Sequence, residues 1–322
     1  MAERQKGLLH DPNRQTVGEF LERWLRDTAA PTLVAKTLET YAHIVRRYIV
    51  PALGRLELAK LSPQHLQQLY REKREAGLTR TVEMIHAVLH VALARAAEWG
   101  LVPRNVAEHA QPTRVRARDM RALTPDEARA FLEAAKEDRL NALYVLAIAC
   151  GLRQGELLGL RWSDIDMDGG TVHVQRSLGW VSGQWLFTEG KTAKSRRTVV
   201  LPRIAVAALK KHRAVQAVER LVLGEAWAHP DLVFTTTVGT PIGKSVLIRR
   251  SFKPILQKAG LPRHSAATML LAAGENPKVV QELLGHSRIS ITLDTYSHVI
   301  PSLQRQVAEK MDNMLAITKP KA

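Results

Sequence analysis

The sequence predicts a mainly α-helical protein with a small antiparallel β-sheet, divided into two domains. Three observations lead to this fold class. The first 110 residues show apolar spacing of helical period and no strand pattern. Segments that favour strands are confined to the middle of the second part, with helices on either side of them. A length of 322 residues fits roughly two domains of 100–200 residues each.

The first domain, residues 14–110, is expected to be small and entirely α-helical. After a helix that begins near Thr16, a second helix runs from about Thr37 to Tyr48 and ends before Pro51. A third helix opens at Ser62-Pro63. A fourth helix runs from Arg80 to Trp99, where the following glycine and a nearby proline end it.

Residues 111–122 form a basic linker between the two predicted domains. This segment contains one proline and four arginines, Arg114, Arg116, Arg118 and Arg121. We expect Arg114, Arg116 and Arg118 to bind DNA phosphates. A solvated hinge that makes no DNA contact would have the same composition.

The second domain, residues 123–322, begins at a helix start signal. Thr124-Pro125-Asp126-Glu127 supplies an N-cap, a proline at the first helical position and a capping-box glutamate. Three short strands are expected at 171–176, 185–188 and 197–201. Helices are expected before and after them, at about 124–136, 140–150, 155–160, 204–223, 244–259, 264–273, 277–284, 289–299 and 303–315.

The charge of the chain indicates a polyanionic partner. The formal net charge is +16 and the isoelectric point is about 10.3. Residues 1–110 hold 16 basic and 12 acidic side chains, whereas residues 111–322 hold 31 and 19, so the excess lies in the second part. Charge alone favours nucleic acid only modestly over a basic soluble surface, so double-stranded DNA is expected as the partner once the motifs below are considered.

The composition also excludes several classes of protein. With Cys150 as its one cysteine, the chain has no internal disulfide and no cysteine-based zinc site, and Cys150 itself is expected to be a small buried hydrophobe. No apolar run is long enough to cross a bilayer, and residues 1–13 lack the apolar region of a signal peptide. We expect a cytoplasmic protein with no membrane partner.

Cutting a phosphodiester without a metal ion requires a fixed set of side chains. Cations must neutralise the charge that develops on the phosphate, and arginine suits this role because its planar fork grips two oxygens. A nucleophile must hold the phosphate covalently, and a general acid must protonate the departing oxygen. The second domain offers candidates for each part.

Three motifs carry these candidates. The first is Gly-Leu-Arg-Gln-Gly-Glu-Leu-Leu-Gly-Leu at 151–160, followed by Trp-Ser-Asp-Ile at 162–165. The second is Gly-Lys-Thr-Ala-Lys-Ser-Arg-Arg at 190–197, between two predicted strands. The third is Leu-Leu-Gly-His at 283–286 with Tyr296 downstream. By itself Tyr296 also fits an apolar helical stripe with Ile289, Leu293 and Ile300, which is typical of core packing.

Together these motifs resemble the tyrosine recombinases, the phage integrase type of site-specific recombinase. The resemblance extends from about Thr16 to Leu315 and implies an all-α core-binding domain followed by a mixed α/β catalytic domain. It assigns the nucleophile to Tyr296, and catalytic roles to Arg153, Lys191, Arg263 and His286, with Glu156 bracing the first motif. Lys194 is the alternative to Lys191. With Arg196 and Arg197, Lys194 is otherwise expected to bind DNA.

The same resemblance implies the reaction and its partners. The chain would act on DNA attachment sites of a mobile element as a homotetramer, without a metal or any other cofactor, and an excisionase or a host DNA-bending protein would assist. In some relatives an arm-binding module precedes these domains. Because only 15 residues precede Thr16, we expect that module to be absent.

One motif departs from the family pattern. In the family the second catalytic arginine ends a His-x-x-Arg motif, whereas Gly260 stands three residues before Arg263 here, and the segment looks shortened. His264 points about 100° away from Arg263 if this segment is helical. Two alternatives therefore stand beside an active recombinase: an impaired remnant that only binds DNA, and a type IB topoisomerase, which uses the same tyrosine chemistry.

Overall fold

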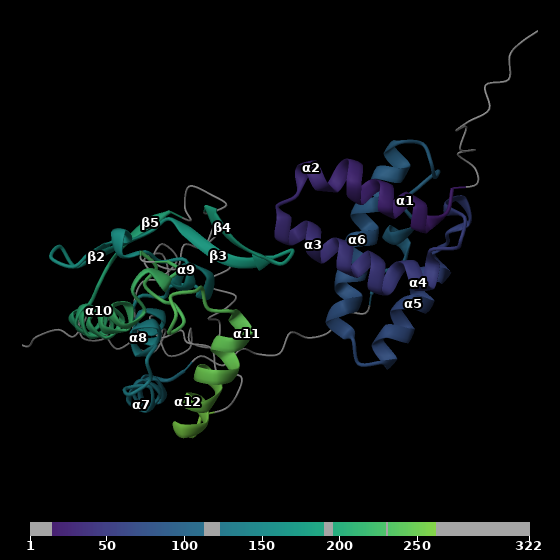
Figure 1. Ribbon diagram of the computed structural model, residues 1–322. Coiled ribbons are helices and arrows are strands. Elements are labelled where there is room, and N and C mark those ends of the chain that lie inside the picture. The colour runs from purple at the N-terminus through teal and green to yellow at the C-terminus, as the bar shows by residue number, and fades with distance from the viewer. Residues whose placement is uncertain (1–14, 113–122, 190–195, 230, 262–322) are drawn as a thin grey trace, which may run out of the picture. The chain divides into compact units, whose positions relative to one another are not determined.

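The computed structural model describes residues 15–112, 123–189, 196–229 and 231–261. The chain divides into two compact units, Met1–Arg118 and Asp119–Ala322 (Figure 1). Both are mainly helical where they are described, and the strands belong to the second unit. The predicted fold class, mainly α with small antiparallel sheets, is confirmed.

The first unit is helical throughout its described part. Its elements are α1 (Val17–Trp24), η2 (Leu25–Ala29), α2 (Ala30–Thr32), α3 (Ala35–Ile44), η3 (Val45–Ile49), α4 (Val50–Leu53), η4 (Leu58–Lys60), α5 (Pro63–Glu75), α6 (Thr79–Glu98) and η5 (Val106–His109). Thr16 caps α1 in a capping box with Glu19, as its position predicts. Trp24 and Phe20 from α1 pack with Leu89 and Leu93 from α6 in a single hydrophobic core.

Prolines interrupt the helices of this unit less than the sequence suggests. A helix was expected to end before Pro51, but it continues to Leu53 through η3, which is a π-helical turn. The N–H of Val50 bonds to the carbonyl of Val45, five residues earlier. The wider turn moves the carbonyl that a proline ring would otherwise strike, so the helix passes Pro51 without breaking. The same arrangement precedes Pro31.

The second unit begins with three helices, α7 (Pro125–Ala134), α8 (Asn141–Ala149) and α9 (Gln154–Leu158). The predicted capping box of Thr124 and Glu127 opens α7. Helix α8 is apolar on all sides, and it lies within the core together with Phe131 of α7 and Phe234. Cys150 ends α8 and is buried, as expected.

The second unit contains two antiparallel sheets where one small sheet was expected. The first has the strand order β1 (Ile165–Asp166), β2 (Thr171–Val174), β5 (Arg197–Val200), and the second pairs β3 (Arg176–Val181) with β4 (Gln184–Glu189). The strand β3 was largely missed from the sequence. The turn Ser182-Gly183, with both φ angles positive, joins it to β4 as a two-residue hairpin.

The remaining described elements are η6 (Trp162–Asp164), α10 (Arg203–Leu223), η8 (Gly224–Ala226), α11 (Lys244–Leu247), η9 (Ile248–Phe252) and α12 (Lys253–Lys258). The last three form one continuous helix, and its π-helical turn again comes directly before a segment that contains a proline, Lys253-Pro254. In Figure 1 the strands run along one edge of this unit, with α7, α8 and α10 on the opposite side of α9. The helices expected beyond residue 261 lie outside the described residues.

Candidate active site

Of the five catalytic side chains assigned by resemblance, the structure describes Arg153. The other four, Lys191, Arg263, His286 and Tyr296, lie outside the described residues, as do the expected DNA contacts Arg114, Arg116, Arg118 and Lys194. The described part of the candidate site therefore consists of Arg153 and the side chains that surround it.

Arg153 occupies the N-terminal boundary of α9 in an extended backbone conformation. The chain leaves α8 through Gly151, whose φ of +63° favours glycine, and then buries Leu152 in the core. Gly151 and Leu152 thereby fix the backbone that joins α8 to Arg153. The side chain of Arg153 remains 44% exposed, so it is accessible to a ligand from solvent.

Glu156 holds this arginine in place. Its Oε2 accepts the backbone N–H of Arg153 at 2.8 Å, and its Oε1 accepts an N–H from the Arg153 guanidinium at 2.9 Å. The carboxylate is 9% exposed, and it lies one helical turn after Arg153 on the same face of α9. The bracing role that the resemblance assigns to Glu156 matches this geometry.

A second arginine completes the coordination of Glu156. Arg197, the first residue of β5, donates to Oε1 at 3.0 Å and to Oε2 at 2.9 Å. With the two bonds from Arg153, each carboxylate oxygen accepts two hydrogen bonds. Burial alone would raise the pKa of Glu156, but these bonds and the charge of Arg197 more than offset it and hold the pKa below its ordinary value.

Arg197 was expected to contact DNA, and in the structure its side chain pairs with Glu156. Its side chain is 8% exposed and is engaged with Glu156, so it is not presented to a phosphate backbone in solvent. Strand alternation explains this: Arg197 shares the inward face of β5 with the buried Val199. Arg196, in contrast, is exposed, and its DNA contact stays a prediction.

Two glycines of the first motif let α9 approach the β3–β4 sheet closely. A Cβ on Gly159 would lie 2.9 Å from the backbone nitrogen of Leu178, and one on Gly155 would lie 3.2 Å from the Cβ of Ser177. Both neighbours belong to β3. The short α9 that carries Glu156 therefore rests directly against the backbone of a strand.

The Trp-Ser-Asp-Ile segment after α9 is anchored by side chains that the sequence did not single out. Gln216 of α10 is buried; it accepts the indole N–H of Trp162 at 2.7 Å and donates to the carbonyls of Leu232 and Val233 at 3.1 and 3.0 Å. The guanidinium of Arg176 pairs with the buried carboxylate of Asp164. Local sequence carries no signal for either contact, because the partners are 54 and 12 residues apart.

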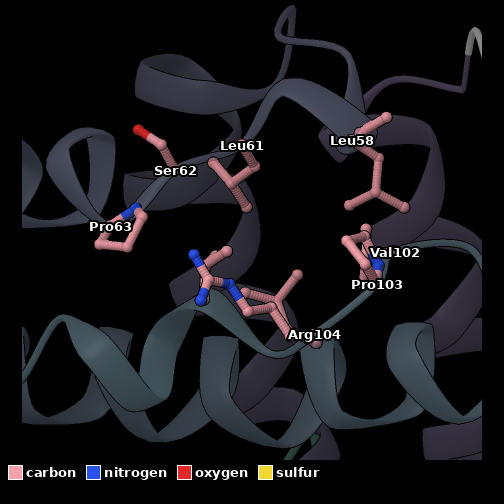
Figure 2. Close-up of a pocket in the computed structure, with 10 residues that line it drawn as sticks. Leu58, Leu61, Ser62, Pro63, Val102, Pro103 and Arg104 are labelled. Atoms are coloured by element: carbon pink, nitrogen blue, oxygen red, sulfur yellow. The ribbon is translucent and has the colours of Figure 1, made fainter.

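One cavity among the described residues belongs to the first unit. It has a volume of about 190 Å³ and is lined in the first unit by mostly apolar side chains around Leu58, Leu61 and Val102, with Arg104 at one side (Figure 2). It holds none of the assigned catalytic residues. No group of three or more metal-binding side chains occurs among the residues that the structure describes. Nor does any described helix have the length and apolarity needed to cross a membrane.

The all-α first unit, the mixed second unit and an arginine held by a buried glutamate define the class of the tyrosine-type site-specific recombinases. Residues 121–302 match the model of the phage integrase family, and residues 16–73 match the phage integrase N-terminal SAM-like domain. The first match spans more than half of the chain. The chain therefore belongs to the phage integrase family.

Relatives with similarity along almost the whole chain agree with this family. A XerC-like tyrosine recombinase of Caldanaerobacter subterraneus subsp. tengcongensis is 31% identical, covering 96% of this chain and 86% of the relative. The ICEBs1 integrase of Bacillus subtilis is 25% identical, covering 94% and 88%. The Tn1549 transposon integrase, solved with transposon right end DNA, has a TM-score of 0.77 at 20% identity over 92% of this chain and 99% of that chain.

Proposed function

We propose that this chain cuts and rejoins double-stranded DNA at specific attachment sites through a covalent 3′-phosphotyrosyl link to Tyr296. The observation that carries the proposal is the half-exposed Arg153, fixed by a buried carboxylate in the motif that the family match contains. A guanidinium held in this way is preorganised for a phosphate whose negative charge rises in the transition state.

The other parts of the reaction follow from the family assignment of residues. The Tyr296 oxygen attacks the scissile phosphorus as its hydroxyl releases a proton and the bond to the 5′ oxygen breaks, and Lys191 gives the departing oxygen a proton. Arg153, Arg263 and His286 stabilise the charge on the phosphate. The 5′-hydroxyl of a second strand reverses the step, so the energy of the broken bond is kept in the phosphotyrosyl link.

The proposed partners rest on the charge of the chain and on its structural neighbours. A lambda integrase with a TM-score of 0.63 to this chain, at 19% identity over 88% of this chain and 78% of that one, was solved as a tetramer bound to a Holliday junction. A homotetramer acting in the cytoplasm on two DNA sites, with an excisionase or a host DNA-bending protein, is the corresponding assembly here. Arg114, Arg116, Arg118, Lys194 and Arg196 would then contact DNA phosphates, as the excess of basic residues in 111–322 suggests.

The test is a nicked suicide substrate that carries candidate attachment sites. The wild-type chain should form an adduct that survives denaturing electrophoresis, and Tyr296→Phe should form none while binding the same DNA. Binding should weaken steeply with salt, with a slope of about −0.9 in log K per phosphate neutralised. Binding that hardly changes with salt would contradict an electrostatic DNA surface.

A second candidate function is specific DNA binding with slow or absent cleavage. Gly260, which stands where the family pattern has histidine, terminates α12 with a φ of +67°. The N–H of Leu261 bonds back to the carbonyl of Leu256, so Gly260 ends the helix by adopting the left-handed backbone conformation. The loss of one transition-state donor typically costs roughly 10²–10³ in rate.

Restoring a His-x-x-Arg segment before Arg263 separates the two candidates. If the shortened segment limits the reaction, the restored variant gives more phosphotyrosyl adduct than the wild type, and Tyr296→Phe abolishes the adduct in both. Family-like cleavage by the unmodified chain would show instead that another group, such as His264, fills the role.

A further inference from the structure

We propose that Arg197 is a positioning residue for DNA cleavage, which acts on Arg153 through Glu156. This inference rests on the proposed recombinase function. It concerns the cluster formed by Arg153, Glu156 and Arg197, called here the Glu156 cluster, which joins the start of α9 to the start of β5.

The geometry of the Glu156 cluster links Arg197 to Arg153. Glu156 is held on α9, and Arg197 reaches it from a strand 41 residues later in the chain. The fork of Arg197 meets both carboxylate oxygens, which fixes the plane of the carboxylate. Because that carboxylate also accepts the backbone N–H and one guanidinium N–H of Arg153, its orientation decides where the guanidinium of Arg153 lies.

The charges of the Glu156 cluster also depend on Arg197. The Glu156 cluster contains two guanidinium groups and one carboxylate, so its net charge is +1 when all three are ionised. Arg197 is the more deeply buried arginine and supplies the compensating charge for Glu156, with side-chain exposures of 8% and 9%. Within the cluster, Arg153 therefore carries the charge that Glu156 does not compensate, on a side chain that is 44% exposed.

Removing Arg197 should alter this balance. Glu156 would then face Arg153 as its one remaining partner in the cluster, and the strongest geometry for such a pair is bidentate. Arg153 would turn from one guanidinium hydrogen bond with Glu156 toward bidentate pairing with it, which draws Arg153 inward and offsets its charge. The cluster would fall from a net charge of +1 to zero at the place where a phosphate must bind.

Arg197 also lies six residues after Lys191, the assigned general acid. Its attachment to Glu156 fixes the first residue of β5, which directly follows the lysine-bearing segment in sequence. The same side chain thus connects the end of the second motif with the arginine of the first motif.

The experiment compares Arg197→Gln with a matched control, Arg176→Gln. Arg176 also begins a strand and pairs with a buried carboxylate in this unit, that of Asp164, which lies outside the Glu156 cluster. For each variant we would measure the midpoint of thermal unfolding, the affinity for DNA and the rate constant of adduct formation on a suicide substrate at saturating protein.

Arg197→Gln is expected to lower the rate constant of adduct formation by roughly 10- to 100-fold, less than the loss for removing a transition-state donor outright. Arg176→Gln is expected to lose thermal stability with an unchanged rate constant. Adding Glu156→Gln to Arg197→Gln should recover part of the rate, because it removes the charge that captures Arg153. In an Arg153→Ala background, Arg197→Gln should cost nothing further.

If the wild type forms no adduct, that result counts against the proposed cleavage function and leaves the positioning role open. The positioning role can then be tested by a spectroscopic measurement. In DNA-free protein with ¹⁵N-labelled arginine, the Nε signal of Arg153 is identified by its loss in Arg153→Lys. This signal should shift in Arg197→Gln and stay in place in Arg176→Gln. An unshifted Arg153 signal, or equal losses of rate in Arg197→Gln and Arg176→Gln, would overturn the positioning role.

Discussion

Replacing Gly159 by alanine tests how closely α9 rests on the β3 strand. The added Cβ would lie 2.9 Å from the Leu178 nitrogen and 3.2 Å from both the Ser177 carbonyl carbon and the Gly155 oxygen. All three neighbours are backbone atoms, so none can rotate away as a side chain would. Overpacking of this kind typically costs about 1–3 kcal/mol.

Gly155→Ala is the matched control. Its Cβ would meet the Ser177 side chain at 3.2 Å, a milder contact, and the helix itself favours alanine over glycine. A compatible Gly→Ala change stabilises by about 0.4–1 kcal/mol because it restricts the unfolded chain. The two effects oppose each other, so the free energy of unfolding of Gly155→Ala should stay within about 1 kcal/mol of the wild-type value.

Thermal unfolding followed by circular dichroism distinguishes the two variants. At about 2–4 °C per kcal/mol for a domain of 150–250 residues, Gly159→Ala should lower the unfolding midpoint of the second unit by roughly 2–12 °C. Gly155→Ala should shift it much less. Equal midpoints for the two variants, or a larger loss for Gly155→Ala, would refute the proposed contact between α9 and the backbone of β3.

Three further predictions concern buried polar groups. Because the fold lowers the pKa of Glu156 below its unfolded value of about 4.5, its ionised form contributes stability that is present above pH 4.5 and is lost as the pH falls through the lowered pKa. In denaturant unfolding, the wild type should therefore lose more stability than Glu156→Gln between pH 6 and pH 3; parallel losses would contradict this. Burial raises the pKa of Cys150 to about 11, so iodoacetamide should label the native chain at pH 8 far more slowly than the denatured chain, and equal labelling rates would show that the thiol is accessible. Gln216→Leu removes the partner of the Trp162 indole N–H and of the Leu232 carbonyl, at about 1–3 kcal/mol for each group that stays unpaired, whereas the Val233 carbonyl keeps its contact with His212. Its midpoint in urea should fall clearly, whereas an unchanged midpoint would mean that water replaces Gln216.

The helical content and the first motif were predictable because their signals are local. Capping residues at Thr16 and Thr124 lie within one turn of the groups they bind; the capping box predicted at Thr124 forms, and Thr16 forms a second one with Glu19. Arg153 and Glu156 are three residues apart, a spacing that places them on one face of α9. Proline was the weaker signal: a helix passes Pro51 through a π-helical turn, since the packing of the unit favours its continuation.

The sequence by itself thus determined the family, the mainly helical fold and the position of Arg153 in a motif. It also assigned Arg197 to DNA, because a run of basic residues is usually a solvated or phosphate-binding surface. The tertiary structure places Arg197 on the inward face of β5, where it pairs with a carboxylate 41 residues earlier in the chain. The partner of a buried charge depends on which distant segments the fold brings together, and the local spacing of residues does not indicate which segments these are.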